Sequence, residues 1–81
     1  MYIYLGSDVV VPEEEIVGIF DIEKVTVDRY MKDYLNFSQK SGRIYYVSLD
    51  MPKSIVVCRE MVYISNVSCD TLKKRAVNSQ N

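Results

Sequence analysis

The hydrophobic pattern of this chain changes its period once, and that change restricts the fold more than any other feature. Residues 1–23 hold short apolar runs, rich in β-branched side chains and broken by Gly, Pro and Asp, which is typical of strands. From Val27 onward the pattern follows the spacing of an amphipathic helix, and strand-like runs return after position 43. The side chains with helical spacing are Val27, Tyr30, Met31, Tyr34, Leu35 and Ser38.

Three strands are expected before the helix. Residues 1–5 and 9–11 predict an opening hairpin around the turn at Gly6, Ser7 and Asp8. Residues 16–21 predict a third strand, in which Gly18 suits a bulge or close packing. The helix is expected over residues 27–39, with Thr26 as its N-terminal cap and Gly42 just beyond its C-terminal end.

The second half predicts three more strands and a short helix. Strands are expected at residues 43–49, 54–59 and 61–64, and the continuous apolar run in the second of these indicates a central strand. Ser68 or Asp70 can cap a short helix that continues through Leu72 and Arg75, with a frayed tail over residues 77–81. The prediction is a single α+β domain over residues 1–81, with a small antiparallel β-sheet, one main helix and a short C-terminal helix.

A chain of 81 residues holds one core that barely offsets the entropy of ordering the chain. Cys58 and Cys69 are too few for a disulfide framework, no apolar run reaches membrane-spanning length, and we expect no signal peptide. We therefore expect reduced thiols, a cytoplasmic protein and no membrane partner. With no histidine and no CxxC pair, we expect neither a metal nor a cofactor, so association with other chains remains as the source of extra stability.

Catalysis is not expected, because the usual catalytic groups are missing. The chain has no histidine to serve as a general base, and its three glycines stand apart rather than forming a phosphate loop. The run of Glu13, Glu14 and Glu15 is expected to be a solvated turn, and Cys58 and Cys69 to be buried or half-buried thiols. No small-molecule substrate is expected.

Charge is divided unevenly along the chain. Residues 1–23 hold six acidic side chains and no basic one, whereas residues 24–81 hold all ten basic side chains and five acidic ones. Two interpretations stay open. Either the charges interleave into an ordinary mixed surface in three dimensions, or an acidic face of one subunit pairs with a basic face of the next in a head-to-tail contact.

Two groups of cations are candidate sites for nucleic acid. Lys73, Lys74 and Arg75 could contact phosphates, although the same triplet also suits a solvated helix end. The second group places Arg43, Lys53 and Arg59 near the tyrosines at positions 45, 46 and 63. The alternative for most of the seven tyrosines is a place in the core or at a subunit contact, rather than stacking on bases.

Four short motifs, in order along the chain, carry a resemblance to a known family. They are MYIYLGSDVVVP, EIVGIFD, PKSIVV and TLKKRA. Together they resemble the RemA and RemB family of small bacterial extracellular-matrix regulators. The resemblance implies a cytoplasmic protein that assembles into a homo-oligomeric ring and, for RemA-like members, binds DNA around the ring as a transcriptional activator.

The chain departs from the DNA-binding members of that family at two places. Glu14 and Glu15 stand where RemA-like chains carry an arginine before the third strand, and only Lys53 remains of their arginine cluster before the central strand. We expect a ring-forming regulator of matrix and biofilm gene expression that contacts DNA through Lys53, Arg43 and the triplet at positions 73–75. The alternative is an interaction or scaffold subunit with the same fold and little DNA affinity, engaging a RemA-type partner.

Overall fold

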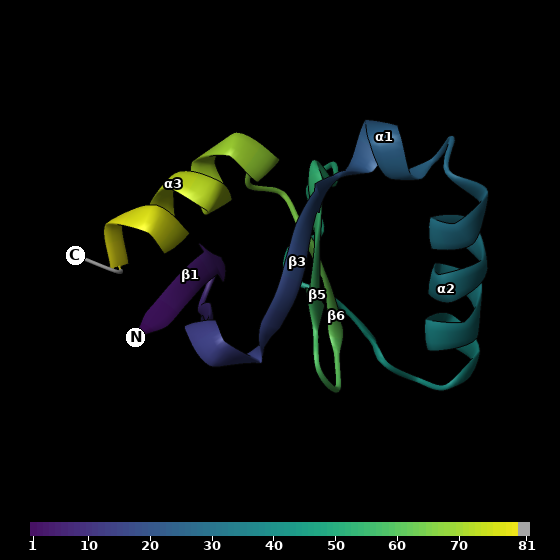
Figure 1. The fold of residues 1–81 in the computed structure, drawn as a ribbon, viewed down its shortest axis with the longest axis horizontal. Helices are drawn as coiled ribbons and strands as arrows, with labels where there is room; N and C mark the ends of the chain where they lie inside the picture. Colours follow the sequence, from purple (N-terminus) through teal and green to yellow (C-terminus); the bar gives the residue numbers. More distant parts are fainter. Residues whose placement is uncertain (80–81) are drawn as a thin grey trace.

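The computed structural model describes the backbone of residues 1–79 and the side chains of residues 1–76. Strands and helices alternate in the order that the change of hydrophobic period predicts, which confirms an α+β fold (Figure 1). The elements are β1 (Tyr2–Gly6), β2 (Val9–Pro12), the 3₁₀ turn η1 (Glu13–Glu15), β3 (Ile16–Asp21), α1 (Ile22–Val25), α2 (Arg29–Lys40), β4 (Ile44–Tyr46), β5 (Ser54–Cys58), β6 (Val62–Ser65) and α3 (Cys69–Ser79).

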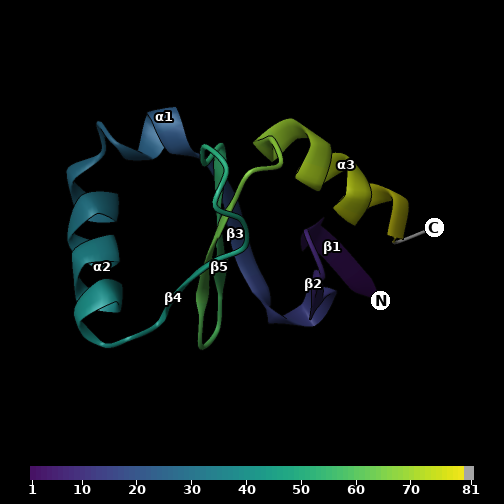
Figure 2. The same cartoon turned by 180° about the vertical axis from the view of Figure 1, so that it is seen from behind.

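A four-stranded sheet divides the molecule into two halves. Its strand order is β3-β5-β6-β4, and the hairpin of β1 and β2 forms a separate two-stranded sheet. Figures 1 and 2 show α2 on one face of the four-stranded sheet, and α3 with the β1–β2 hairpin on the other face. The sheet is therefore covered on both faces but has two free lateral edges, β3 and β4.

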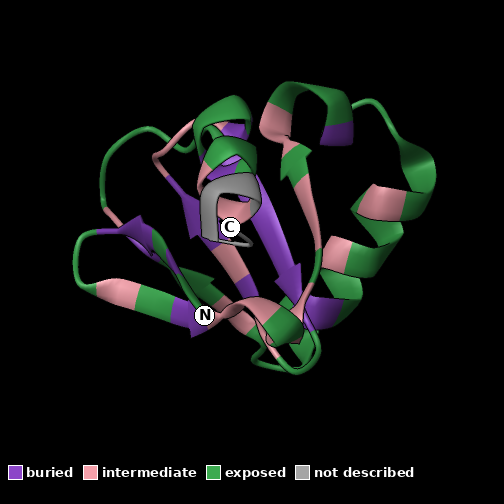
Figure 3. Ribbon diagram, turned by 60° about the vertical axis from the view of Figure 1, so that its left-hand side comes forward, coloured by how far each residue is buried: buried purple, intermediate pink, exposed green. Residues whose placement is uncertain are grey.

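The central strand β5 joins two separate cores. All five of its residues are buried, as its apolar run predicts (Figure 3). Because side chains alternate along a strand, Val56 and Cys58 belong to the cluster that includes Leu72 of α3. Ile55 and Val57 belong to the cluster on the α2 side. Both faces of the sheet thus depend on one strand.

The main helix begins later than its periodicity predicts, and its cap is different. Asp28, not Thr26, accepts a hydrogen bond from the backbone N–H of Met31 at 3.1 Å, and α2 runs from Arg29 to Lys40. Thr26 instead ends α1, a short helix that the sequence did not predict. Val27 lies outside α2 and is 82% exposed, so it contributes nothing to the core.

The C-terminal end of α2 confirms the role expected of Gly42. The N–H of Gly42 donates to the carbonyl of Gln39, and the N–H of Arg43 donates to the carbonyl of Ser38, the pattern of a Schellman motif. Gly42 has a φ of +70°, which an L side chain adopts only with strain. The motif turns the chain from α2 directly into β4.

The strand expected at residues 43–49 is shorter and runs in an unexpected direction. β4 covers only Ile44–Tyr46 and pairs with β6 in parallel, whereas the other strand pairs are antiparallel. The parallel pair arises because α2 carries the chain across one face of the sheet to its far edge. Just after β4, the N–H of Val47 still donates to the carbonyl of Ile64 at 2.9 Å, and the Val47 side chain is buried in the core on the α3 side.

The remaining expectations concern Gly18 and the C-terminus. A register shift separates Ile16 from Gly18, and a Cβ at Gly18 would lie 2.7 Å from the ring of Phe20, so both a bulge and close packing occur. The C-terminal helix α3 continues to Ser79, past the end expected near Arg75. The backbone of residues 77–79 thus continues this helix, residues 80 and 81 lie outside the described part, and fraying of the tail stays a prediction.

Candidate interaction surfaces

The expected DNA contacts Arg43 and Lys53 lie at opposite ends of the four-stranded sheet. Arg43 accepts a backbone hydrogen bond from Val62, where β6 begins, and Lys53 donates one to Ser65, where β6 ends. The registers of β5 with β3 and β6 place these two ends a full strand length apart. One subunit therefore does not bring the two side chains together.

Lys53 lies in an acidic neighbourhood. It lines a hollow together with Asp21, Glu23 and Asp70, which come from β3, α1 and α3. Three carboxylates beside one ammonium group make this hollow negative overall, which opposes phosphate binding. The role that the family resemblance implies for Lys53 thus has little local support in one subunit.

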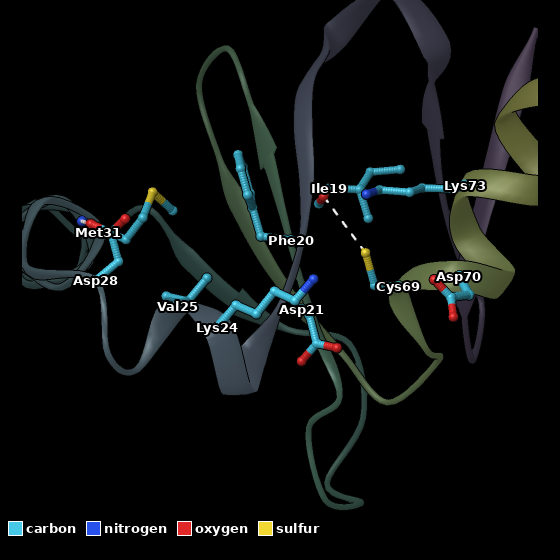
Figure 4. Close-up of a pocket in the computed structure, with 10 residues that line it drawn as sticks. All are labelled: Ile19, Phe20, Asp21, Lys24, Val25, Asp28, Met31, Cys69, Asp70 and Lys73. Atoms are coloured by element: carbon cyan, nitrogen blue, oxygen red, sulfur yellow. Dashed lines mark hydrogen bonds between the residues drawn. The ribbon is translucent and has the colours of Figure 1, made fainter.

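Lys73 occupies a similar setting at the free edge of β3. It lines a hollow of about 310 Å³ with Lys24 and three carboxylates, those of Asp21, Asp28 and Asp70. Figure 4 shows Lys73 extending toward Ile19, beside the contact in which the Cys69 thiol donates to the Ile19 carbonyl at 3.7 Å. This hollow is mixed in charge rather than basic.

Arg75 is already engaged within the subunit. Its guanidinium donates to the carbonyl of Tyr4 at 2.7 Å and lies 5.7 Å from the centre of the Tyr4 ring. Both contacts tie α3 to β1, so Arg75 stabilises the fold rather than presenting a free charge. Of the expected triplet, Lys74 alone is exposed and neither lines the hollow beside β3 nor contacts Tyr4.

Exposed apolar side chains gather at both free edges of the sheet. Beside β3, a groove of about 330 Å³ is lined by Val17 and Phe20 of the strand and by Met31 and Tyr34 of α2. Val17 is 70% exposed. Beyond β4, the exposed large side chains are Tyr45, Tyr46, Leu49 and Met51. The edge residues Val17 and Phe20 could not be found from the sequence, because their strand pattern does not show which edge stays unpaired.

The tyrosines do not fill the core. Six of the seven are exposed, and Tyr63 alone is half-buried, with its ring 5.9 Å from that of Tyr45. Of the two places expected for most tyrosines, the core is excluded for these six, and a role at subunit contacts stays a prediction. The exposed tyrosines are Tyr2, Tyr4, Tyr30, Tyr34, Tyr45 and Tyr46.

Both cysteines are buried free thiols, as expected. Burial, together with the nearby carboxylate of Glu15, raises the pKa of Cys58 from 9.0 to about 11. Burial, with the charges of Cys58 and Tyr45, also raises the pKa of Tyr63. Because the thiolate is the reactive form, Cys58 is poorly suited to nucleophilic or redox chemistry at neutral pH.

The raised pKa of Cys58 predicts a loss of stability in alkali. The folded state favours the protonated thiol, so this stabilisation is complete below pH 9 and disappears as the pH rises through about 11. Urea unfolding at intervals from pH 8 to pH 11 is expected to show this decline. Cys58→Ala should show a shallower decline, because it removes one of the two groups whose pKa is raised; equal declines in both proteins would contradict the assignment.

Within the described residues, neither a metal site nor a membrane-spanning helix is found. No three His, Cys, Asp or Glu side chains are arranged to hold a metal ion. No helix in that part of the chain combines the length and the apolar character needed to cross a membrane.

Comparison with known proteins supplies the family. No family model matches the chain. It is, however, 45% identical over 76 residues to extracellular matrix regulatory protein B of Bacillus subtilis (strain 168), and the match covers 94% of this chain and 90% of that protein. Identity at this level over nearly the whole of both chains shows common descent and a common fold. The chain therefore belongs to the RemB-like family of extracellular-matrix regulatory proteins.

Proposed function

We propose that this protein is a cytoplasmic regulator of extracellular-matrix gene expression that assembles head to tail into a homo-oligomeric ring and binds DNA as that ring. The observation that carries the proposal is the pair of unpartnered sheet edges, each with large exposed apolar side chains. The name of the relative, an extracellular matrix regulatory protein, supports the regulatory part of the proposal. An isolated subunit would leave this apolar surface in water.

The direction of the strands supports a head-to-tail contact. β3 is antiparallel to β5, β5 is antiparallel to β6, and β6 is parallel to β4, so β3 and β4 point the same way. Rotating a second copy about an axis along the strands brings its β4 beside β3 of the first in parallel. Such a contact joins two different surfaces, and it closes into a ring when the rotation divides a full turn.

The side chains at the two edges are compatible with this contact. The groove beside β3 offers apolar lining, and β4 offers the exposed rings of Tyr45 and Tyr46. β4 has only three residues, so few backbone hydrogen bonds can form across the contact. Burial of apolar side chains must then supply most of the association energy.

Paired edge variants test the head-to-tail arrangement. Val17→Asp places a charge on the β3 edge and Tyr46→Asp places one on the β4 edge, so each variant alone is expected to be monomeric. Mixed in equal amounts, the two should form a heterodimer through the one edge that each retains, as measured by native mass spectrometry. Tyr2→Asp, at an exposed position of the hairpin, is the control and should keep the wild-type mass.

The same variants test whether DNA binding depends on assembly. Linked binding sites commonly gain about 10²–10⁴-fold in avidity over single ones. The Val17→Asp monomer is therefore expected to bind a fluorescein-labelled DNA duplex at least about 100-fold more weakly than wild type at low salt, as measured by anisotropy. Failure of both proteins to bind duplex DNA would contradict the DNA-binding part of the proposal.

The scaffold function is a second candidate, and one observation favours it. Lys53 and Lys73 lie among carboxylates, and Arg75 is held by Tyr4, so three of the five expected DNA contacts are compromised. A ring that forms as proposed but leaves DNA unbound, and that exchanges subunits with a RemA-type protein, would favour this function. Native mass spectrometry of the mixed proteins distinguishes the two.

A further inference from the structure

The outer surface of α2 carries a row of cations that lies apart from the residues considered above. Arg29, Lys32, Asn36 and Lys40 recur at intervals of three, four and four, so they lie on one flank of the helix. All four are exposed. Figure 1 shows α2 as the outermost element on its side of the sheet.

The position of this flank follows from the residues on the other sides of α2. Met31 and Leu35 pack into the core beneath the helix, and Tyr34 lines the groove beside β3. At 100° per residue, Lys32 lies about 160° around the helix from Tyr34. The cationic row is therefore turned away from the β3 edge and from the apolar contact proposed there.

The charged groups of these cations also have no partner among the described residues. Within the described part of the chain, the side chains of Arg29, Lys32 and Lys40 form no ion pair or hydrogen bond with another residue. Asp33 is the one carboxylate within the helix itself. Lys53 and Lys73, in contrast, each share a hollow with three carboxylates. The three cations of α2 thus exceed the one carboxylate of the helix, and Arg43 adds a fourth cation just beyond its C-terminal end.

We propose that this flank of α2, through Arg29, Lys32 and Lys40, is the surface that contacts the phosphates of duplex DNA. The row runs the twelve residues of the helix, whose eleven steps of 1.5 Å make it roughly 16 Å long. Along one DNA strand that length covers about five phosphates at 3.4 Å each. Asn36, between the cations, can donate to a phosphate oxygen as well. This inference rests on the DNA-binding function proposed above.

Repetition of the subunit in a ring is expected to raise the affinity of this cationic row for DNA. A few phosphate contacts from one copy give only weak binding, but every copy in a ring presents the same row. Contacts of this kind depend on the phosphate backbone rather than on the bases, so affinity should fall steeply with salt and vary little with sequence.

The salt dependence of binding to a labelled duplex of mixed sequence tests the site. We expect Lys32→Ala/Lys40→Ala to weaken binding at least about tenfold at 0.1 M salt and to reduce the slope of log K against log salt by about 1.8, at 0.9 for each contact. Lys73→Ala/Lys74→Ala removes the same charge from α3 on the opposite face of the sheet and tests the rival site that the sequence suggested. If α2 carries the contacts, this variant keeps the wild-type slope. Lys24→Ala, at an exposed position of α1, is the control outside both sites and should bind as wild type does.

The outcomes separate this inference from the proposed function. If wild type binds the duplex and the α2 variant binds equally well, or if only the α3 variant loses affinity, α2 is not the contact surface. If wild type fails to bind any duplex, the DNA-binding function itself fails. Lysine-dependent binding to vesicles containing phosphatidylserine, without binding to DNA, would also overturn the inference. Light scattering and circular dichroism verify that both variants keep the wild-type mass and helix content.

Discussion

Replacing Leu72 by alanine is expected to lower the free energy of unfolding by about 2–5 kcal/mol. Leu72 is fully buried, and it holds α3 in the cluster that contains Leu5 of the hairpin and Val56 of the central strand. Truncation leaves a cavity where three elements meet. A domain of this length has roughly 4–12 kcal/mol of total stability, so a large part of it would be lost.

Urea unfolding followed by circular dichroism measures this loss. Titrations at several protein concentrations are needed, because association of the folded subunits raises their apparent stability. Leu72→Met keeps the volume and is expected to lose less than about 1.5 kcal/mol. If Leu72→Ala also lost less than about 1 kcal/mol, α3 would not be fixed through this side chain.

Ser65→Ala is expected to lower the free energy of unfolding by about 2–4 kcal/mol, because it removes a buried hydroxyl with two partners. The Ser65 hydroxyl donates to the carbonyl of Leu5 at 2.6 Å and accepts from the N–H of Val67 at 3.0 Å. The first bond links the end of β1 to β6, and the second links β6 to the start of the β6–α3 connection. Without the hydroxyl, both backbone groups lose a partner that water cannot easily replace.

A surface serine provides the comparison for this prediction. Ser41 is exposed at the C-terminal cap of α2, so Ser41→Ala should change stability by less than about 0.5 kcal/mol. The same urea titration serves for both proteins. An equal and small effect of the two substitutions would show that the Ser65 hydroxyl is not needed to join the hairpin to the sheet.

Local patterns in the sequence predict most of the elements but not how they meet. The apolar run of β5 and the glycine after α2 are strong local signals, and both are confirmed. The parallel pairing of β4 depends on how far α2 carries the chain, which no short pattern records. The apolar stripe of α2 was only partly informative, because Tyr30 is 87% exposed although its spacing fits the stripe.

The candidate DNA contacts were harder to predict, because their surroundings come from distant parts of the chain. Lys53 is next to a proline in sequence, but the carboxylates beside it belong to β3, α1 and α3. Arg75 reaches Tyr4, which lies 71 positions earlier. The spacing of Arg29, Lys32 and Lys40 was visible in the sequence. Only the fold shows that these three cations form no ion pair with a carboxylate of the described residues.

The central claim is that one subunit is incomplete until copies meet through the free edges of its sheet. Multi-angle light scattering on the wild-type protein after size-exclusion chromatography tests it most directly. We predict a molar mass that is a whole multiple, greater than two, of the 9.4 kDa subunit mass. A mass of one subunit at every concentration would contradict the account.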